Sequence, residues 1–276
     1  EQYLHFKSRG DLGYLYYFRG DSGKALEAGK EMVEYGEKHS NIRSQAMGHA
    51  ALGWGYLVAG DFQSAISSLY RVEQIAMDPF YATVWSCFRA FAHFFEGQFQ
   101  EVEVALERAE KCMKAGFDYL EGYLSLGWGL LWIAEGRIGK GMNMLFEARQ
   151  IYLRNELKCS YALSEYILGR VYMGMALGEG DVSLSTMLKN IGFLLKTIPF
   201  AARRAESHFT KAIEVAHEIG AKGTQASAHL DLGNLHKAKK RNGQAREHLT
   251  EAVKLFEQCE AEIFLKQAKE ALASLG

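Results

Sequence analysis

The stretch LGWGYLVAGDFQSAI, residues 52–66, places two glycines around a tryptophan inside a segment that otherwise has the composition of a helix. A glycine inside a helix costs about 1 kcal/mol relative to alanine. A near copy, LGWGLLWIAEGRIGKG, occurs at 126–141. Because the same costly feature occurs twice, it indicates an internal repeat in which the glycines have a packing purpose.

Outward from this stretch, the chain shows a repeat of about 40 residues. A small residue that follows a large one recurs at intervals of 40, 37, 39, 40 and 64 residues, at Gly13, Gly53, Ala90, Gly129, Gly169 and Gly233. Three residues after it stands a ring: Tyr16, Tyr56, His93, Trp132, Tyr172 and His236. Seven residues after it, four units carry a glycine: Gly20, Gly60, Gly97 and Gly136. The long last interval indicates an insertion of about 24 residues in the fifth unit.

Each unit is predicted to be two helices joined by a tight turn. After Gly60, apolar residues recur at helical spacing and form one stripe. Gly60 is placed to end the first helix with a positive φ, and Asp61 to cap the second helix. Small residues where the two helices cross allow their axes to approach closely.

This pattern resembles the tetratricopeptide repeat over essentially the whole chain, although the period exceeds the usual value of about 34 residues. The resemblance implies an all-α fold, a right-handed superhelical solenoid of about six helix pairs with a capping helix at about 260–275. We expect one domain over 1–276 with an apolar insertion at about 179–202, in a fragment of a larger protein. Residues 205–262 further resemble the C-terminal tail of multidomain bacterial adenylate/guanylate cyclases with an ATPase module.

Composition and charge exclude several functions. The chain has 32 basic and 33 acidic residues, so its formal charge of −1 offers no field for nucleic acid or an anionic membrane. The four cysteines are scattered without a C-x-x-C pair, which favours reduced thiols and a cytoplasmic location. No apolar run reaches the roughly 18–20 residues that span a bilayer.

The sequence contains no recognisable active site. His229 and His236 lie seven residues apart, but no carboxylate or thiol joins them at ligand spacing, so packing is favoured over metal binding. The glycine-rich stretches at 136–141 and 220–224 lack the phosphate-loop spacing. Carboxylates are expected to decorate solvated helix faces. We therefore expect no catalysis, no metal and no cofactor.

Partner binding is expected on the first helices of the units. In the tetratricopeptide family the groove-facing positions lie one, four and five residues after the small residue. The resemblance therefore implies a protein-binding groove formed by Tyr14, Tyr17, Phe18, Trp54, Leu57, Phe91, Phe94, Phe95, Leu130, Ile133, Arg170, Asn234 and Lys237. Its first four units are aromatic and apolar, and its C-terminal end is polar and basic. Such a groove suits a peptide, a helix or another domain of the same chain.

The apolar insertion is hypothesised to form a helix that packs into the concave side or against another copy of the chain, and the simpler reading is an extra helix that extends the stack. The expected function is a non-catalytic protein-interaction scaffold, which could regulate an ATPase or nucleotide cyclase in the parent chain. A homo-oligomerisation platform and a small-molecule sensor are the rival functions.

Overall fold

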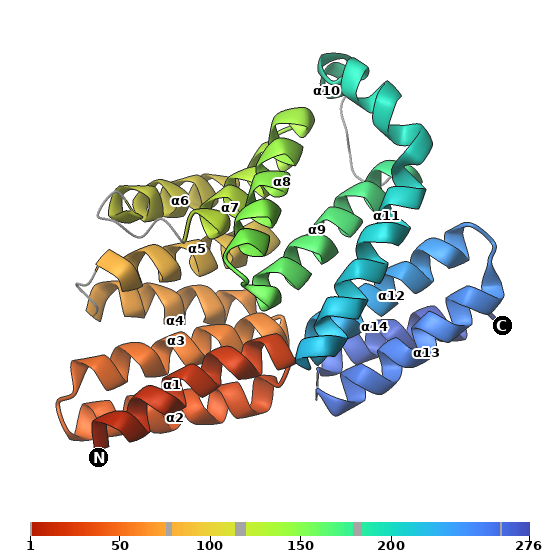
Figure 1. Cartoon of the computed structure of the whole chain (residues 1–276). Coiled ribbons are helices and arrows are strands. Elements are labelled where there is room, and N and C mark those ends of the chain that lie inside the picture. Colours follow the sequence, from red (N-terminus) through yellow and green to blue (C-terminus); the bar gives the residue numbers. More distant parts are fainter. Residues whose placement is uncertain (1, 76–78, 114–119, 179–183, 260) are drawn as a thin grey trace. The chain divides into compact units, whose positions relative to one another are not determined.

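The computed structural model describes residues 2–75, 79–113, 120–178, 184–259 and 261–276, and these form helices and turns without a β-strand (Figure 1). Six helix pairs follow one another, α1–α2, α3–α4, α5–α6, α7–α8, α9–α11 and α12–α13, and α14 follows the last pair. The all-α helical-repeat fold predicted from the sequence is confirmed.

The chain divides into two compact units, residues 1–131 and 132–276. The first contains α1 (Gln2–Arg19), α2 (Ser22–Lys38), α3 (Ile42–Ala59), α4 (Phe62–Ile75), α5 (Pro79–Phe95), α6 (Phe99–Met113) and most of α7 (Glu121–Ala134). The second contains α8 (Ile138–Arg154), α9 (Lys158–Leu177), α10 (Leu184–Lys189), α11 (Ile191–Ile219), α12 (Lys222–Ala238), α13 (Asn242–Gln258) and α14 (Glu262–Ala273). That both units belong to a single domain stays a prediction.

The turns inside the pairs have the predicted backbone. Gly20, Gly60, Gly97 and Gly136 all have φ between 72° and 79°, the left-handed conformation that costs glycine least. The side chain of Asp61 accepts a hydrogen bond from the Ser64 amide at 3.1 Å, as expected of a helix cap.

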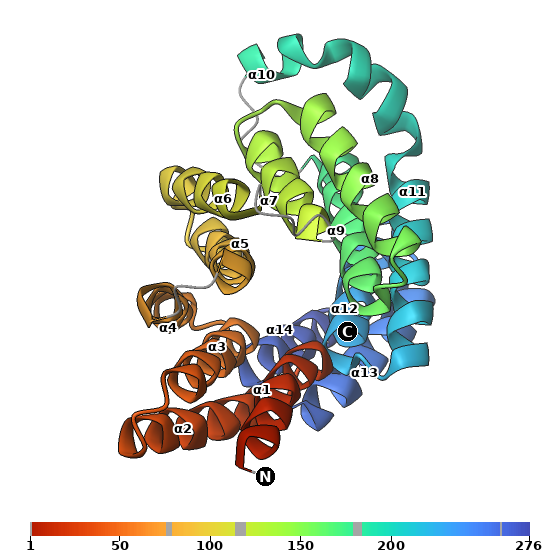
Figure 2. The same cartoon turned by 60° about the vertical axis from the view of Figure 1, so that its left-hand side comes forward.

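The two glycines around Trp54 serve two different neighbours. A Cβ on Gly53 would lie 2.6 Å from the Leu69 side chain of α4, the partner helix within the pair. A Cβ on Gly55 would lie 2.8 Å from Leu26 of α2, in the preceding pair. Helix α3 therefore lies close to α4 on one flank and close to α2 on the other. Each close approach needs its own glycine. Figure 2 shows this arrangement in the first unit, with α2, α4 and α6 on one side and α1, α3 and α5 on the other.

The described part of the insertion lengthens α11 and does not fill the concave side. Its residues 191–202 are continuous with the second helix of the fifth pair, and α10 precedes them. The Asn190 side chain donates to the Gly136 carbonyl at 2.7 Å, and Phe193 lies 3.7 Å from where a Cβ on Gly139 would stand. The insertion thus packs against the α7–α8 turn and the start of α8. For these residues the hypothesis that the insertion fills the groove is therefore wrong. Residues 179–183 lie outside the described part.

Two buried charge clusters join neighbouring helix pairs. Glu73 of α4, whose side chain is 1% exposed, accepts from Arg89 Nε of α5 at 2.8 Å and pairs with Arg108 of α6. In the second unit, Glu165 of α9 is equally buried and accepts from Arg149 Nε of α8 at 2.7 Å. The expectation that carboxylates would only decorate solvated faces is therefore wrong at these two positions.

Candidate binding groove

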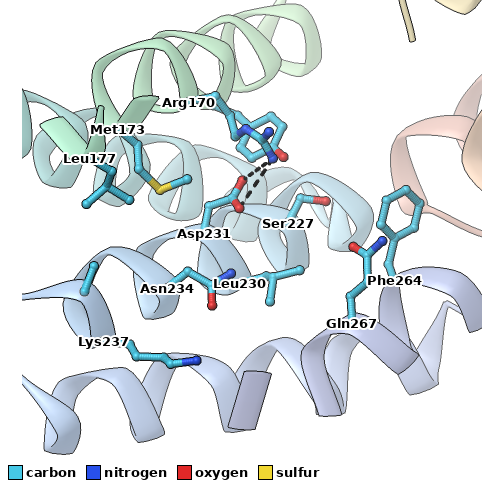
Figure 3. Close-up of a pocket in the computed structure, with 12 residues that line it drawn as sticks. Arg170, Met173, Leu177, Ser227, Leu230, Asp231, Asn234, Lys237, Phe264 and Gln267 are labelled. Carbon is cyan, nitrogen blue, oxygen red and sulfur yellow. Dashed lines mark hydrogen bonds and ion pairs between the residues drawn. The ribbon is translucent and has the colours of Figure 1, made fainter. Parts of the chain in front are cut away.

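The second unit contains an open pocket of about 590 Å³ between α9, α12 and α14 (Figure 3). Each helix contributes side chains that recur every three or four residues and therefore share one face. These are Tyr166, Arg170, Met173 and Leu177 from α9, Ser227, Leu230, Asp231, Asn234, Lys237 and Ala238 from α12, and Phe264 and Gln267 from α14. The structure thus brings Arg170, Asn234 and Lys237, three residues predicted from the sequence, into one pocket.

An ion pair within this pocket joins α9 to α12, the first helices of the last two pairs. Arg170 Nη1 lies 3.2 Å from Asp231 Oδ2, and the carboxylate side chain is only 7% exposed. The charge of Asp231 raises the pKa of Arg170 further above its ordinary value. Burial is the main reason that the pKa of the nearby Tyr166 is also raised. Arg170 therefore stays protonated, and the carboxylate of Asp231 balances its charge. The ion pair links α9 to α12.

Asn234 and Lys237 supply the remaining polar groups on α12. Among the described residues, the amide of Asn234 has no hydrogen-bond partner, so it offers both a donor and an acceptor to the pocket. Lys237 Nζ donates to Ser274 Oγ at 2.5 Å, just beyond the end of α14. After Arg170 and Asp231 have cancelled, Lys237 leaves the pocket with one positive charge.

The aromatic half of the predicted groove is largely buried in the first unit. Phe18, Trp54, Leu57 and Phe91 are each at most 9% exposed. The three aromatic members pack on neighbouring rings: Trp54, for example, lies 5.1 Å from Tyr14 and 4.8 Å from Trp85, measured between ring centroids. The expectation that these four side chains face a partner is corrected, because the first helices approach closely enough for the rings to fill the space between them.

The other predicted groove residues of the first four pairs have mixed exposure. Tyr14 and Tyr17 are half-buried, and the Tyr14 hydroxyl lies 3.0 Å from that of Tyr123. Phe94, Leu130 and Ile133 are half-buried as well, and Phe95 is 62% exposed. Phe95 stacks on Phe62 at 4.9 Å. Phe95 is the one residue of the predicted aromatic groove that is clearly accessible.

A second, polar pocket of about 440 Å³ surrounds Glu165 in the second unit. His208 Nδ1 lies 2.6 Å from Glu165 Oε2, and Arg149 binds the other carboxylate oxygen. Burial raises the pKa of Glu165, but the hydrogen bonds from His208 and Tyr161 and the charge of Arg149 outweigh it, so the pKa lies below the usual range. This cluster has no signal in the sequence, because its members come from three helices and share no local spacing. The carboxylate is already satisfied, which indicates a packing role.

Three histidines cluster in the last helix pair. His229 Nδ1 and His248 Nδ1 are 3.0 Å apart, and the His236 ring stacks on that of His248 at 5.5 Å. Within the described part of the chain, no group of three or more metal-ligating side chains is suitably placed to hold a metal ion. The three rings contact one another across α12 and α13.

Acidification is expected to destabilise this pair. Burial and then the charge of His248 lower the pKa of His229 to about 4, and burial likewise lowers the pKa of His236 and of His248. The folded state then binds fewer protons than the unfolded state below about pH 6.5, so stability is complete above that pH and falls as the pH drops towards 4. We expect a loss of about 1–2 kcal/mol between pH 7.5 and 5.0 in urea unfolding.

The matched substitutions are His229→Gln and His217→Gln. His229→Gln should reduce this pH dependence, because it removes the group with the most lowered pKa. His217→Gln should leave it unchanged, because His217 is exposed at the end of α11. Equal pH dependence in wild type and His229→Gln would contradict the prediction.

Comparison with known proteins places the chain among helical-repeat folds. No protein-family model and no curated protein matches the sequence. Among solved structures, a Rap protein complexed with Competence and Sporulation Factor matches with a TM-score of 0.60 and 14% identity, over 99% of this chain and 71% of the Rap protein. The apo form of RapI matches with a TM-score of 0.50 and 13% identity, over 98% and 70% of the two chains.

BtubC from P. vanneervenii matches with a TM-score of 0.50 and 13% identity, over 87% of this chain and 92% of BtubC. At these identities the likeness shows the fold, and that fold is a tetratricopeptide-like helical repeat. The cyclase-associated type of repeat is not shown by these matches. In the described residues, no helix is both long enough and apolar enough to cross a membrane.

Proposed function

We propose that the chain is a non-catalytic protein-interaction module that binds an extended peptide segment in the pocket between α9, α12 and α14. The pocket carries this proposal, because its volume of about 590 Å³ falls in the range of ligand sites, roughly 300–1,000 Å³. The matched Rap structure holds Competence and Sporulation Factor, and that likeness supports a bound partner on the same fold.

The chemistry of the lining suits a peptide backbone with mixed side chains. The Asn234 amide has the donor and acceptor needed to pair with one peptide N–H and one peptide carbonyl. Leu230, Met173 and Phe264 offer apolar contacts on all three helices. Lys237 favours an acidic side chain or a terminal carboxylate at one end.

Binding to peptides selected against the full chain tests this proposal. Peptides enriched from a random library should bind the wild type, and Asn234→Ala should weaken that binding at least about tenfold, because it leaves two peptide groups unpaired in a partly buried site. Lys237→Glu should reverse the preference for acidic peptides. Asn242→Ala, at the exposed start of α13, is the matched control and should bind as wild type.

Selected peptides that bind Asn234→Ala and Lys237→Glu as tightly as wild type would place the partner site elsewhere. Thermal unfolding of each variant keeps a folding defect from being taken for a binding defect. Regulation of an ATPase or cyclase in the parent chain, and a cytoplasmic location, stay predictions from the sequence.

A further inference from the structure

The insertion carries a stripe of aliphatic side chains that are exposed on the surface of the second unit. Leu188, Ile191, Leu195 and Ile198 are 61%, 52%, 70% and 46% exposed, and they are spaced by three, four and three residues. The opposite side of α11 is committed to the core of the second unit through Leu194 and Ala201. This aliphatic stripe lies on α10 and the start of α11, which project past the neighbouring helices of that unit (Figures 1 and 2).

The helical face beside the aliphatic stripe is basic. No acidic residue occurs between positions 182 and 205. Lys189, Lys196 and Arg203 are exposed, and within the described residues none of them forms an ion pair. A helix with exposed aliphatic side chains and unpaired cations fits a partner surface that is both apolar and acidic.

Helix α6 in the first unit has the complementary surface. Glu103, Glu107 and Glu110 are exposed at i, i+4 and i+7 and therefore form one acidic row. Among the described residues their one cationic contact is Lys111, 4.0 Å from Glu107. Beside this row Val104 is 56% exposed and Phe99 41% exposed, so apolar surface accompanies the acidic charge.

We propose that the aliphatic stripe of one copy packs on the acidic face of α6 of a second copy. The rows match in length, because in both Ile191–Ile198 and Glu103–Glu110 the end residues are seven positions apart, or about 10 Å along the helix. Lys196 and Arg203 then meet the glutamates while the aliphatic side chains cover Val104 and Phe99. Charge complementarity selects this occupant over a stripe-to-stripe dimer, which would bring the cations of two copies together.

This contact is heterologous, because it joins two different surfaces of the chain. Such contacts do not close on a two-fold axis, and successive copies add head to tail. The expected assembly therefore grows with concentration past a dimer and weakens as salt screens the charged rows. The residues of this contact do not line the pocket, so association between copies does not depend on peptide binding.

Sedimentation of the full chain at about 1–100 µM tests the proposal, a range chosen for a weak contact. At low salt the average mass should rise with concentration, and at about 0.5 M salt it should fall towards the monomer. Lys196→Glu with Arg203→Glu should weaken association at least about tenfold, and so should Glu103→Lys with Glu107→Lys. Lys211→Glu with Lys254→Glu, on other exposed surfaces of the second unit, should associate as wild type.

Mixing the two defective double variants distinguishes a contact between copies from any other use of these surfaces. Each variant retains the surface that the other has lost, and the reversed rows are again opposite in charge, so the mixture should regain association. A wild type that stays monomeric at the highest concentration would overturn the proposal. So would a mixture that remains monomeric, or binding of the wild type to phosphatidylglycerol vesicles without self-association. All four reversed residues are exposed, so circular dichroism should show unchanged helix content.

Discussion

Replacing Glu73 by leucine is expected to destabilise the first unit by about 3–5 kcal/mol, because the substitution leaves a buried cation without its counter-charge. The Arg89 side chain is only 8% exposed, and Glu73 accepts hydrogen bonds from its Nε at 2.8 Å and from Ser86 Oγ at 3.0 Å. Arg108 is 46% exposed and can turn to solvent, but Arg89 cannot. Urea unfolding monitored by near-ultraviolet circular dichroism measures the loss of stability. The signal comes from the rings that pack around Trp54 in the first unit.

The control separates a buried charge from charge removal in general. Glu214→Leu removes a carboxylate from an exposed i, i+3 pair on α11, where exposed pairs typically contribute roughly 0.2–1 kcal/mol. The double variant Glu73→Leu with Arg89→Leu should recover much of the stability, because replacing both members of a buried pair is often close to neutral. A single variant within about 1 kcal/mol of wild type would show that the cluster does not behave as a buried ion pair.

The two buried ion pairs also favour one register at two junctions, between α4 and α5 and between α8 and α9. Glu73 and Arg149 each lie 20 residues after the small residue of their own unit, at Gly53 and Gly129. Each bonds a side chain on the first helix of the next pair, with opposite charge in the two cases. A unit placed beside the wrong neighbour would bury one of these charges unpaired. We infer that the residue 20 positions after the small residue fixes which unit follows at these two junctions.

Local patterns predicted the turns and the close crossings of helices. The glycine at the seventh place after the small residue has a positive φ because that place ends a helix, and the end of a helix is a property of a few adjacent residues. The packing role of Gly53 is likewise predictable from spacing along the chain. Sequence spacing fixes which face of a helix a residue occupies, and that suffices for contacts inside one helix pair.

Exposure on those faces could not be predicted, because it depends on distances between pairs. Trp54 lies on the expected face, yet the neighbouring rings bury it. Of the residues that line the pocket between α9, α12 and α14, the sequence predicted only Arg170, Asn234 and Lys237. The spacing 227, 230, 234 and 237 extends that row along α12 and could have revealed Ser227 and Leu230. Phe264 and Gln267 carry no such signal, since α14 meets the pocket only through tertiary packing.

The close crossing of α2 and α3 makes Gly48→Ala the other large expected effect. A Cβ on Gly48 would lie 2.7 Å from the Val33 backbone nitrogen and 2.9 Å from the Gly29 carbonyl oxygen. Backbone atoms cannot move aside as a side chain does, so the two helices must separate. Overpacking of this kind costs typically 1–3 kcal/mol, and we expect a net loss near the upper end, about 3 kcal/mol, in spite of the better helix propensity of alanine.

Two further glycine variants decide whether backbone contact is the cause. Gly53→Ala meets the Leu69 side chain and no backbone atom, so its loss should be smaller than that of Gly48→Ala. Gly243→Ala, on α13, meets nothing within 4 Å and should leave stability unchanged or raise it by up to about 1 kcal/mol. Urea unfolding of the three variants gives the order directly. If Gly48→Ala were as stable as Gly243→Ala, the backbones of α2 and α3 would have to lie further apart than a direct glycine-to-backbone contact allows.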